Sequence, residues 1–141
     1  RINSVCLGLL SNIPKQTLLA RIQYYLDLMH ISNLINKKPH QFSSGQKKKI
    51  LLIQALIHQP KILILDEPAA DLDFSARYEL FQLLVQLQNQ GMSILISSHI
   101  LNEIERYVDS CTLIHAGKVV YTGHKYDRLE RIYEKTVLSK H

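Results

Sequence analysis

The sequence predicts an α/β fold with a parallel sheet, crossover helices and a C-terminal β-hairpin. Two short apolar runs, at residues 61–66 and 92–97, lie between turn-forming residues and are interpreted as buried strands. A segment with helical periodicity, about 75–90, separates them. This strand–helix–strand order favours a parallel pair of strands joined by a crossover helix. The 141 residues suffice for one domain with its own core.

Residues 1–60 are predicted to be helical. Pro14 suits the first turn of a helix that runs to about Met29, because its fixed φ is compatible with a helix start. A polar loop at 36–40 follows. Ser43 is then a good N-cap for a second helix that reaches about His58. Pro60 cannot continue that helix and marks its end.

The segments after residue 61 are predicted to alternate between strands and helices. The helix at 75–90 takes its period from Phe81, Leu84, Val85 and Gln88. A short helix at 100–108 precedes a hairpin, in which 111–115 and 118–121 pair across Ala116 and Gly117. We expect three parts: a helical subdomain at 1–60, the C-terminal part of an α/β core at 61–124, and a charged helical tail at 125–141.

The composition argues against several protein classes. Hydrophobic residues make up 46% of the chain, which is typical of a folded globular protein. No apolar run approaches the roughly 18 residues that span a bilayer. The 2 cysteines form no CxxC motif, and the 7 histidines lack metal-ligand spacing, so we expect neither a disulfide scaffold nor a zinc site. A net charge of +5 permits an anionic partner, but a solvated basic surface is the favoured interpretation.

Two adjacent carboxylates, Asp66 and Glu67, directly follow the first predicted strand. In open α/β sheets, ligands bind outside the carboxyl ends of the strands. Asp66 therefore suits Mg²⁺, held directly or through water, and Glu67 suits a general base that activates water. The alternative is an ordinary polar turn at a strand end.

Residues 42–46, with the sequence Phe-Ser-Ser-Gly-Gln, precede the second predicted helix. A helix N-terminus presents unpaired N–H groups and the positive end of the helix dipole, which together bind phosphate. Small residues allow a ligand to approach the backbone closely, and Ser43 adds a hydroxyl. An ordinary capped helix start is the alternative.

Two polar segments complete the set of candidate motifs. Residues 70–73 end in Asp73, which lies just downstream of the carboxylate pair and could instead cap the following helix. Residues 97–99 end in His99, at the end of the second strand. A lone histidine is more often structural than functional, but its place at a strand end favours a functional role.

The ordered set of motifs resembles the ATP-binding cassette family of ATPases. Residues 42–46 look like the signature motif, residues 62–67 like the Walker B strand with its catalytic glutamate, residues 70–73 like the D-loop, and His99 like the switch histidine. The resemblance covers nearly all of residues 1–124. It implies a partial P-loop NTPase core with a helical subdomain.

By this resemblance, the expected cofactors are ATP and Mg²⁺, and ATP would be held between two cassettes arranged head to tail. Asp66 would bind the metal, and Glu67 and His99 would be catalytic. The nucleotide-binding residues would be Ser43, Ser44, Gly45 and Gln46, which face the γ-phosphate held by the partner cassette, and Asp73, which couples the two sites.

The chain departs from the family in lacking a Walker A loop. That loop needs the pattern G-x-x-x-x-G-K-[ST], and of the 5 glycines only Gly117 precedes a lysine, which Val119 then follows. The glutamine loop is also missing, and the chain begins with Arg1 rather than Met. We expect a truncated cassette with negligible ATPase activity alone and an exposed apolar sheet face. Ser44 replaces a usual signature glycine, which would weaken the phosphate contact.

The leading functional interpretation is the ATP-hydrolysing subunit of a membrane transporter, bound to a transmembrane permease on the cytoplasmic face of the cell membrane. Residues 98–105 and Asp109 look most like the cassettes of export-type transporters.

Two alternatives remain open. A soluble cassette ATPase acting on nucleic acid or ribosomes is compatible with the lysine run 47–49, but no heptad pattern or second cassette supports it, and nucleic acid is not expected as a partner. A degenerate, non-catalytic remnant is the other alternative. The presence of both carboxylates and of His99 argues against it.

Overall fold

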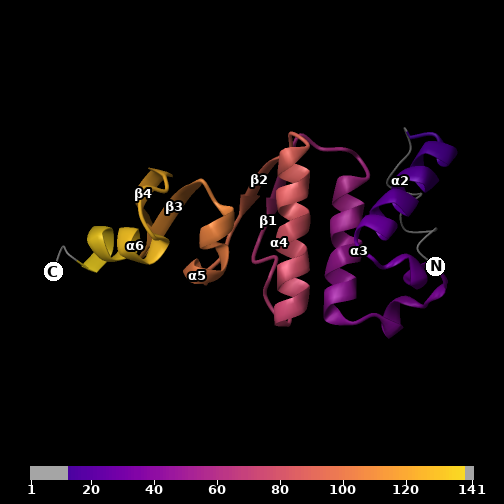
Figure 1. Ribbon diagram of the computed structural model, residues 1–141, viewed down its shortest axis with the longest axis horizontal. Helices are drawn as coiled ribbons and strands as arrows, with labels where there is room; N and C mark the ends of the chain where they lie inside the picture. Colours follow the sequence, from indigo (N-terminus) through magenta and orange to yellow (C-terminus); the bar gives the residue numbers. More distant parts are fainter. Residues whose placement is uncertain (1–12, 139–141) are drawn as a thin grey trace. The chain divides into compact units, whose positions relative to one another are not determined.

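The computed structural model describes residues 13–138, and the chain divides into two compact units (Figure 1). The first unit ends at Ile96 and the second begins at Ser97. This division differs from the expected parts 1–60, 61–124 and 125–141, because the two parallel strands and the helix between them pack with the preceding helices. The three-part division stays a prediction. Within residues 13–138, no helix has the length and apolar character to cross a membrane.

From residue 13 onward, the first unit contains two helices close to their predicted positions. Helix α2 spans Lys15–Leu28 with Pro14 at its N-cap, and α3 spans Ser44–Leu56 with Ser43 at its N-cap. Two 3₁₀ turns, η1 (Ser32–Asn36) and η2 (Pro39–Gln41), connect the helices and overlap the two ends of the predicted polar loop at 36–40. Helix α3 ends before His58, because the chain turns at Gln59, which adopts a φ of 52° ahead of Pro60.

The predicted strand–helix–strand unit is confirmed. Strand β1 (Ile62–Leu65) pairs in parallel with β2 (Ser93–Ile96), and Leu65 lies opposite Ile96. Helix α4 (Phe74–Asn89) connects the two strands. Gly91, with a φ of 96°, allows the chain to turn from α4 into β2, as expected.

One face of this two-stranded sheet is uncovered. Leu63 is only 4% exposed, whereas Ile62, Ile64 and Leu95 are 63%, 70% and 61% exposed. The expectation of buried strands is therefore wrong for this face, and the expectation of an exposed apolar face is confirmed. Parallel sheets normally have both faces covered, so the uncovered side is an apolar surface without its usual helices.

The second unit contains a hairpin and short helices. Helix α5 (Leu101–Ile104) and the 3₁₀ turn η3 (Glu105–Tyr107) are followed by the antiparallel strands β3 (Ser110–His115) and β4 (Lys118–His124). The turn at Ala116 and Gly117 has positive φ at both positions, 49° and 72°. The predicted hairpin is confirmed, and β4 extends three residues beyond the expected end.

Helix α6 spans Leu129–Val137, so the tail is helical as predicted. It is also amphipathic: Leu129 and Ile132 are 1% and 0% exposed. The tail is thus part of the core of the second unit, because its apolar residues recur on one helix face.

Candidate functional site

The start of α3 is fixed by a reciprocal capping box. The Ser43 Oγ accepts a hydrogen bond from the Gln46 backbone N–H at 3.2 Å, and the Gln46 Oε1 accepts one from the Ser43 backbone N–H at 3.0 Å. The Lys47 N–H already bonds to the Ser43 carbonyl. The first-turn donors of Ser44 and Gly45 therefore have no partner within the helix and can meet an anion.

The helix start also lies against residues 70–76 of the same chain. A Cβ added at Gly45 would meet the Leu72 Cδ2 at 3.6 Å and the Ala76 Cβ at 3.8 Å, which is ordinary van der Waals contact. The predicted signature segment and the predicted D-loop are thus neighbours in the first unit. Ser44 is exposed beside them.

Asp66 and Glu67 leave the carboxyl end of β1, at the edge where β2 also ends. Asp66 is exposed and Glu67 is half-buried. Glu67 has a φ of 44°, a left-handed conformation that costs a non-glycine residue about 1–2 kcal/mol. Its carbonyl accepts the Ala70 N–H at 3.1 Å, which closes a tight turn after the strand.

The donor set at this edge fits Mg²⁺ better than a transition metal. Residues 13–138 contain no group of three or more His, Cys, Asp or Glu side chains that could hold a metal ion. Mg²⁺ keeps several waters and is usually bound through one or two carboxylates together with phosphate oxygens. Asp66 alone, with a nucleotide, can meet that requirement.

Asp73 caps α4, as the structural alternative proposed. Its Oδ1 accepts the Ala76 backbone N–H at 2.8 Å. The Leu72 carbonyl accepts a hydrogen bond from the Arg77 Nε at 2.7 Å, which holds the chain just before the cap. One carboxylate oxygen of Asp73 is therefore committed to the helix.

Sequence reasoning missed the role of two lysines in the run 47–49. The Lys48 Nζ donates to the carbonyl oxygens of Pro68, at 3.4 Å, and Ala70. The Lys49 Nζ donates to the Met29 carbonyl at 3.0 Å and forms an ion pair with Glu79 at 2.6 Å. Their spacing could have indicated this role. Lys48 and Lys49 lie three and four residues after Gly45, so they share its face of the helix.

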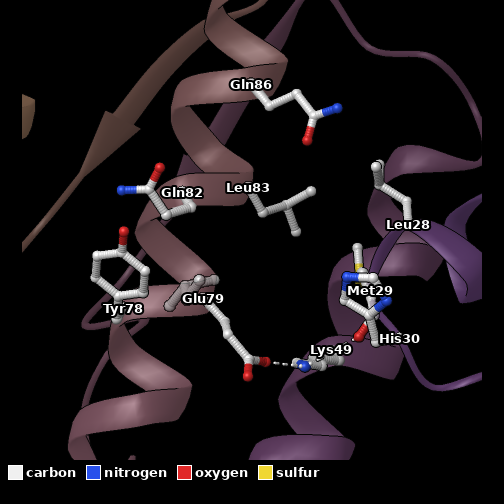
Figure 2. A pocket seen from close by; sticks show the side chains of 10 residues that line it. Leu28, Met29, His30, Lys49, Tyr78, Glu79, Gln82, Leu83 and Gln86 are labelled. Atoms are coloured by element: carbon white, nitrogen blue, oxygen red, sulfur yellow. Dashed lines mark hydrogen bonds and ion pairs between the residues drawn. The ribbon is translucent and has the colours of Figure 1, made fainter.

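A cavity of about 200 Å³ is lined by residues at the C-terminal end of α2 and by side chains of α3 and α4 (Figure 2). Figure 2 shows the Lys49–Glu79 ion pair at its edge and Met29 and His30 beside it. No predicted site residue lines this cavity. The carboxylate pair and the start of α3 thus lie outside the lining of this cavity.

His99 belongs to the second unit, unlike the other predicted site residues. It is exposed and follows Ser98, whose Oγ accepts the Ile100 N–H at 3.1 Å. The first unit therefore contains residues 43–46, both carboxylates and Asp73.

Residues 13–105 match a family described as "AAA domain, putative AbiEii toxin, Type IV TA system". The chain is 48% identical over 118 residues to a putative ABC transporter ATP-binding protein of Mycoplasma pneumoniae. The aligned region covers 83% of this chain and 36% of that protein. The chain belongs to the ATP-binding cassette ATPases. The AAA-type match agrees with a P-loop NTPase.

Other cassette proteins agree in sequence and in fold. The chain is 33% identical to the ABC transporter ATP-binding protein NatA of Bacillus subtilis, over 90% of this chain and 50% of that protein. It is similar to the structure of cbiO1 from Clostridium perfringens, part of the ABC transporter complex cbiONQ, with a TM-score of 0.76 and 33% sequence identity. The match covers 96% of this chain and 54% of the cbiO1 chain. The chain thus spans about half or less of these cassette proteins, and the predicted partial P-loop NTPase fold is confirmed.

Proposed function

We propose that this chain supplies the signature, Walker B and D-loop elements of the ATP-hydrolysing subunit of a membrane transporter. The observation that carries this proposal is the placement of the carboxylate pair at the carboxyl end of a parallel strand, in one unit with the capped start of α3. The relatives support it, since their names describe ABC transporter ATP-binding proteins.

Each carboxylate has a separate role. Asp66 is exposed at the strand end and would hold Mg²⁺, which when bound neutralises charge on phosphate oxygens. Glu67 would accept a proton from the attacking water as general base. Its left-handed backbone gives it a direction that a continued strand would not.

The start of α3 would recognise the γ-phosphate of ATP held by a second cassette. The N–H groups of Ser44 and Gly45 and the hydroxyl of Ser43 are the donors that remain once the capping box has formed. The Gln46 side-chain amide adds donors from the same turn.

Asp73 and His99 have proposed roles of their own. Asp73, which caps α4 with one oxygen, would couple the two nucleotide sites of the cassette dimer through the other. His99 would contact the γ-phosphate and help position the water.

The proposed transporter role also implies partners and a location for the protein. A transmembrane permease subunit and a second cassette would be its partners, on the cytoplasmic face of the cell membrane. Residues 98–105 and Asp109 favour an export-type system.

The structure supplies an observation against the nucleic-acid alternative. Lys48 and Lys49 are both engaged with groups of their own chain, so only Lys47 of that run is exposed. A basic run that binds phosphate backbones needs its ammonium groups at the surface. Salt-dependent RNA or DNA binding by the purified chain would contradict this conclusion.

The deciding experiment uses a reconstituted cassette, in which this chain is joined to the Walker A half of an intact cassette such as the Mycoplasma pneumoniae relative. We expect Mg²⁺-dependent ATP hydrolysis by the reconstituted cassette and negligible hydrolysis by the 141-residue chain alone. Glu67→Gln should lower kcat by about 10²–10⁴-fold, the usual contribution of a general base. Glu134→Gln, at an exposed position of α6, is the matched control. A Glu67→Gln rate near that of the parent would show that another group is the base.

A further inference from the structure

We propose that Lys48 is a positioning residue that holds the catalytic turn after Glu67 from the signature helix. Its Nζ donates to the carbonyl oxygens of Pro68 and Ala70, which lie one and three residues beyond Glu67. This inference rests on the proposed function, because it assigns Lys48 a role in the geometry of the general base.

The turn needs such a restraint. Glu67 adopts a φ of 44°, and Asp71, four residues later, a φ of 59°, so two non-glycine residues in this segment are left-handed. Strained backbone of this kind persists only where its surroundings determine it. Within the turn, the Ala70 N–H bond to the Glu67 carbonyl supplies one restraint, and Lys48 supplies two more from another element.

The chemistry of Lys48 suits this task. An ammonium group carries three donors and no acceptor, so it can bond two carbonyl oxygens at once. Hydrogen bonds from a charged donor are stronger than those between neutral groups. Lys48 is half-buried, which reduces competition from water, unlike its exposed neighbour Lys47.

The same contact links two motifs that would meet different nucleotides. Lys48 lies one turn beyond Gly45 on α3, and Gly45 itself packs against Leu72 and Ala76. The helix start that would face the ATP of the partner cassette is therefore attached, at two points, to the segment that orients Glu67. A displacement of α3 would shift the Pro68 and Ala70 carbonyls and with them the general base.

The first test measures the geometry of the turn in the 141-residue chain. Lys48→Met keeps most of the aliphatic stem but removes the donors. We expect it to change the HN–Hα coupling of Glu67 and to speed amide exchange at Ala70 about tenfold, while Lys48→Arg and the control Lys47→Met leave both unchanged. If Lys48→Met does not fold, as judged by its urea midpoint, Lys48→Gln replaces it. An unaltered Glu67 coupling and Ala70 exchange rate would overturn the proposal.

The second test measures ATP hydrolysis by the reconstituted cassette. Lys48→Met should lower kcat about tenfold with the KM for ATP within twofold, and Lys48→Arg should restore kcat. An unchanged kcat, or an equal loss in Lys47→Met, would overturn the proposal. If the parent cassette hydrolyses no ATP, the proposed function fails; the Glu67 coupling in the 141-residue chain then decides separately whether Lys48 holds the turn.

Discussion

Ser43 and Gln46 cap the first turn of α3 reciprocally, each bonding the backbone N–H of the other. The two residues that would recognise a phosphate thus also fix the helix that presents them. Under the proposed function, the same two side chains would serve both the stability of the helix start and the recognition of a phosphate.

Replacing Ser43 with alanine should destabilise the first unit by about 1 kcal/mol, because the Gln46 N–H loses its side-chain acceptor. Urea denaturation, followed by NMR of the Leu56 methyl groups, measures the loss. The matched control is Ser44→Ala, one residue into the helix, where we expect a change within about 0.5 kcal/mol. Equal effects of the two substitutions would contradict a capping role.

Lys49 and Glu79, which form an ion pair, should contribute unequally to the free energy of unfolding. Glu79 is half exposed, so Glu79→Gln should cost less than about 1 kcal/mol, and the cost should shrink at high salt. Lys49→Met should cost about 1–2 kcal/mol, because it also leaves the Met29 carbonyl without its donor. A double-mutant cycle of urea unfolding energies separates the two contributions. Equal costs would mean that the Met29 contact adds nothing.

The hairpin turn should accept a stabilising substitution at Ala116. Positive φ at both central residues defines a type I′ turn, in which asparagine is preferred before glycine. Ala116→Asn should therefore stabilise the second unit by about 0.5–1 kcal/mol, measured by urea denaturation followed at the Leu113 methyl groups. Ala116→Val is the control with the opposite expected effect. It should destabilise the hairpin, because a β-branched residue disfavours positive φ. A destabilising Ala116→Asn would mean that the turn is not held in this conformation.

Elements with strong local signals were predicted from the sequence with little error. Ser43, Pro14 and Gly91 act through their own backbone geometry, so their positions could be inferred without knowledge of the fold. The buried face of α4 was predicted less well. Phe81 and Leu84 are buried, but Gln88 is exposed and Leu80, Leu83 and Leu87 complete the core. Which side of a helix is covered depends on its neighbours, and periodicity alone does not fix that.

Contacts between distant segments could not be predicted. Lys48 and Lys49 belong to a run that resembles a solvated basic face, yet each bonds a segment at least 20 residues away. The left-handed φ of Glu67 is likewise a property of the turn after β1 rather than of the residue type, since glutamate rarely adopts it. The site chemistry was inferred from residue types and order, whereas its positioning depends on tertiary structure.

The uncovered sheet face should drive self-association of the isolated chain. Ile62, Ile64 and Leu95 form an exposed apolar surface on two strands whose outer edges are unpaired within the described residues. Ile64→Lys should reduce association in sedimentation velocity without loss of helical circular dichroism. Leu63→Ala, on the covered face, should instead destabilise the fold by about 2–5 kcal/mol. Undiminished association of Ile64→Lys would place the contact elsewhere.

Asp127 should make the second unit sensitive to acid. The Arg128 backbone N–H at 2.8 Å and the Lys135 ammonium at 3.0 Å lower the pKa of the Asp127 carboxyl from its ordinary value of 3.8. A pKa that is lower in the folded state stabilises the fold above the unfolded value, and this contribution is lost as pH falls through the folded pKa. Unfolding energies of the second unit, read at the Ile132 methyl groups, should therefore decrease as pH falls below about 4.

Asp127→Asn should weaken that dependence, because the amide does not titrate. The matched control is Asp27→Asn in the first unit, where the Ser32 hydroxyl and the Gln23 amide lower the pKa of the carboxyl in the same direction. It should alter the acid response at the Leu26 methyl groups and leave that at Ile132 unchanged. An Asp127→Asn variant with the parent's pH profile at Ile132 would show that the Lys135 and Arg128 contacts do not form in the folded protein.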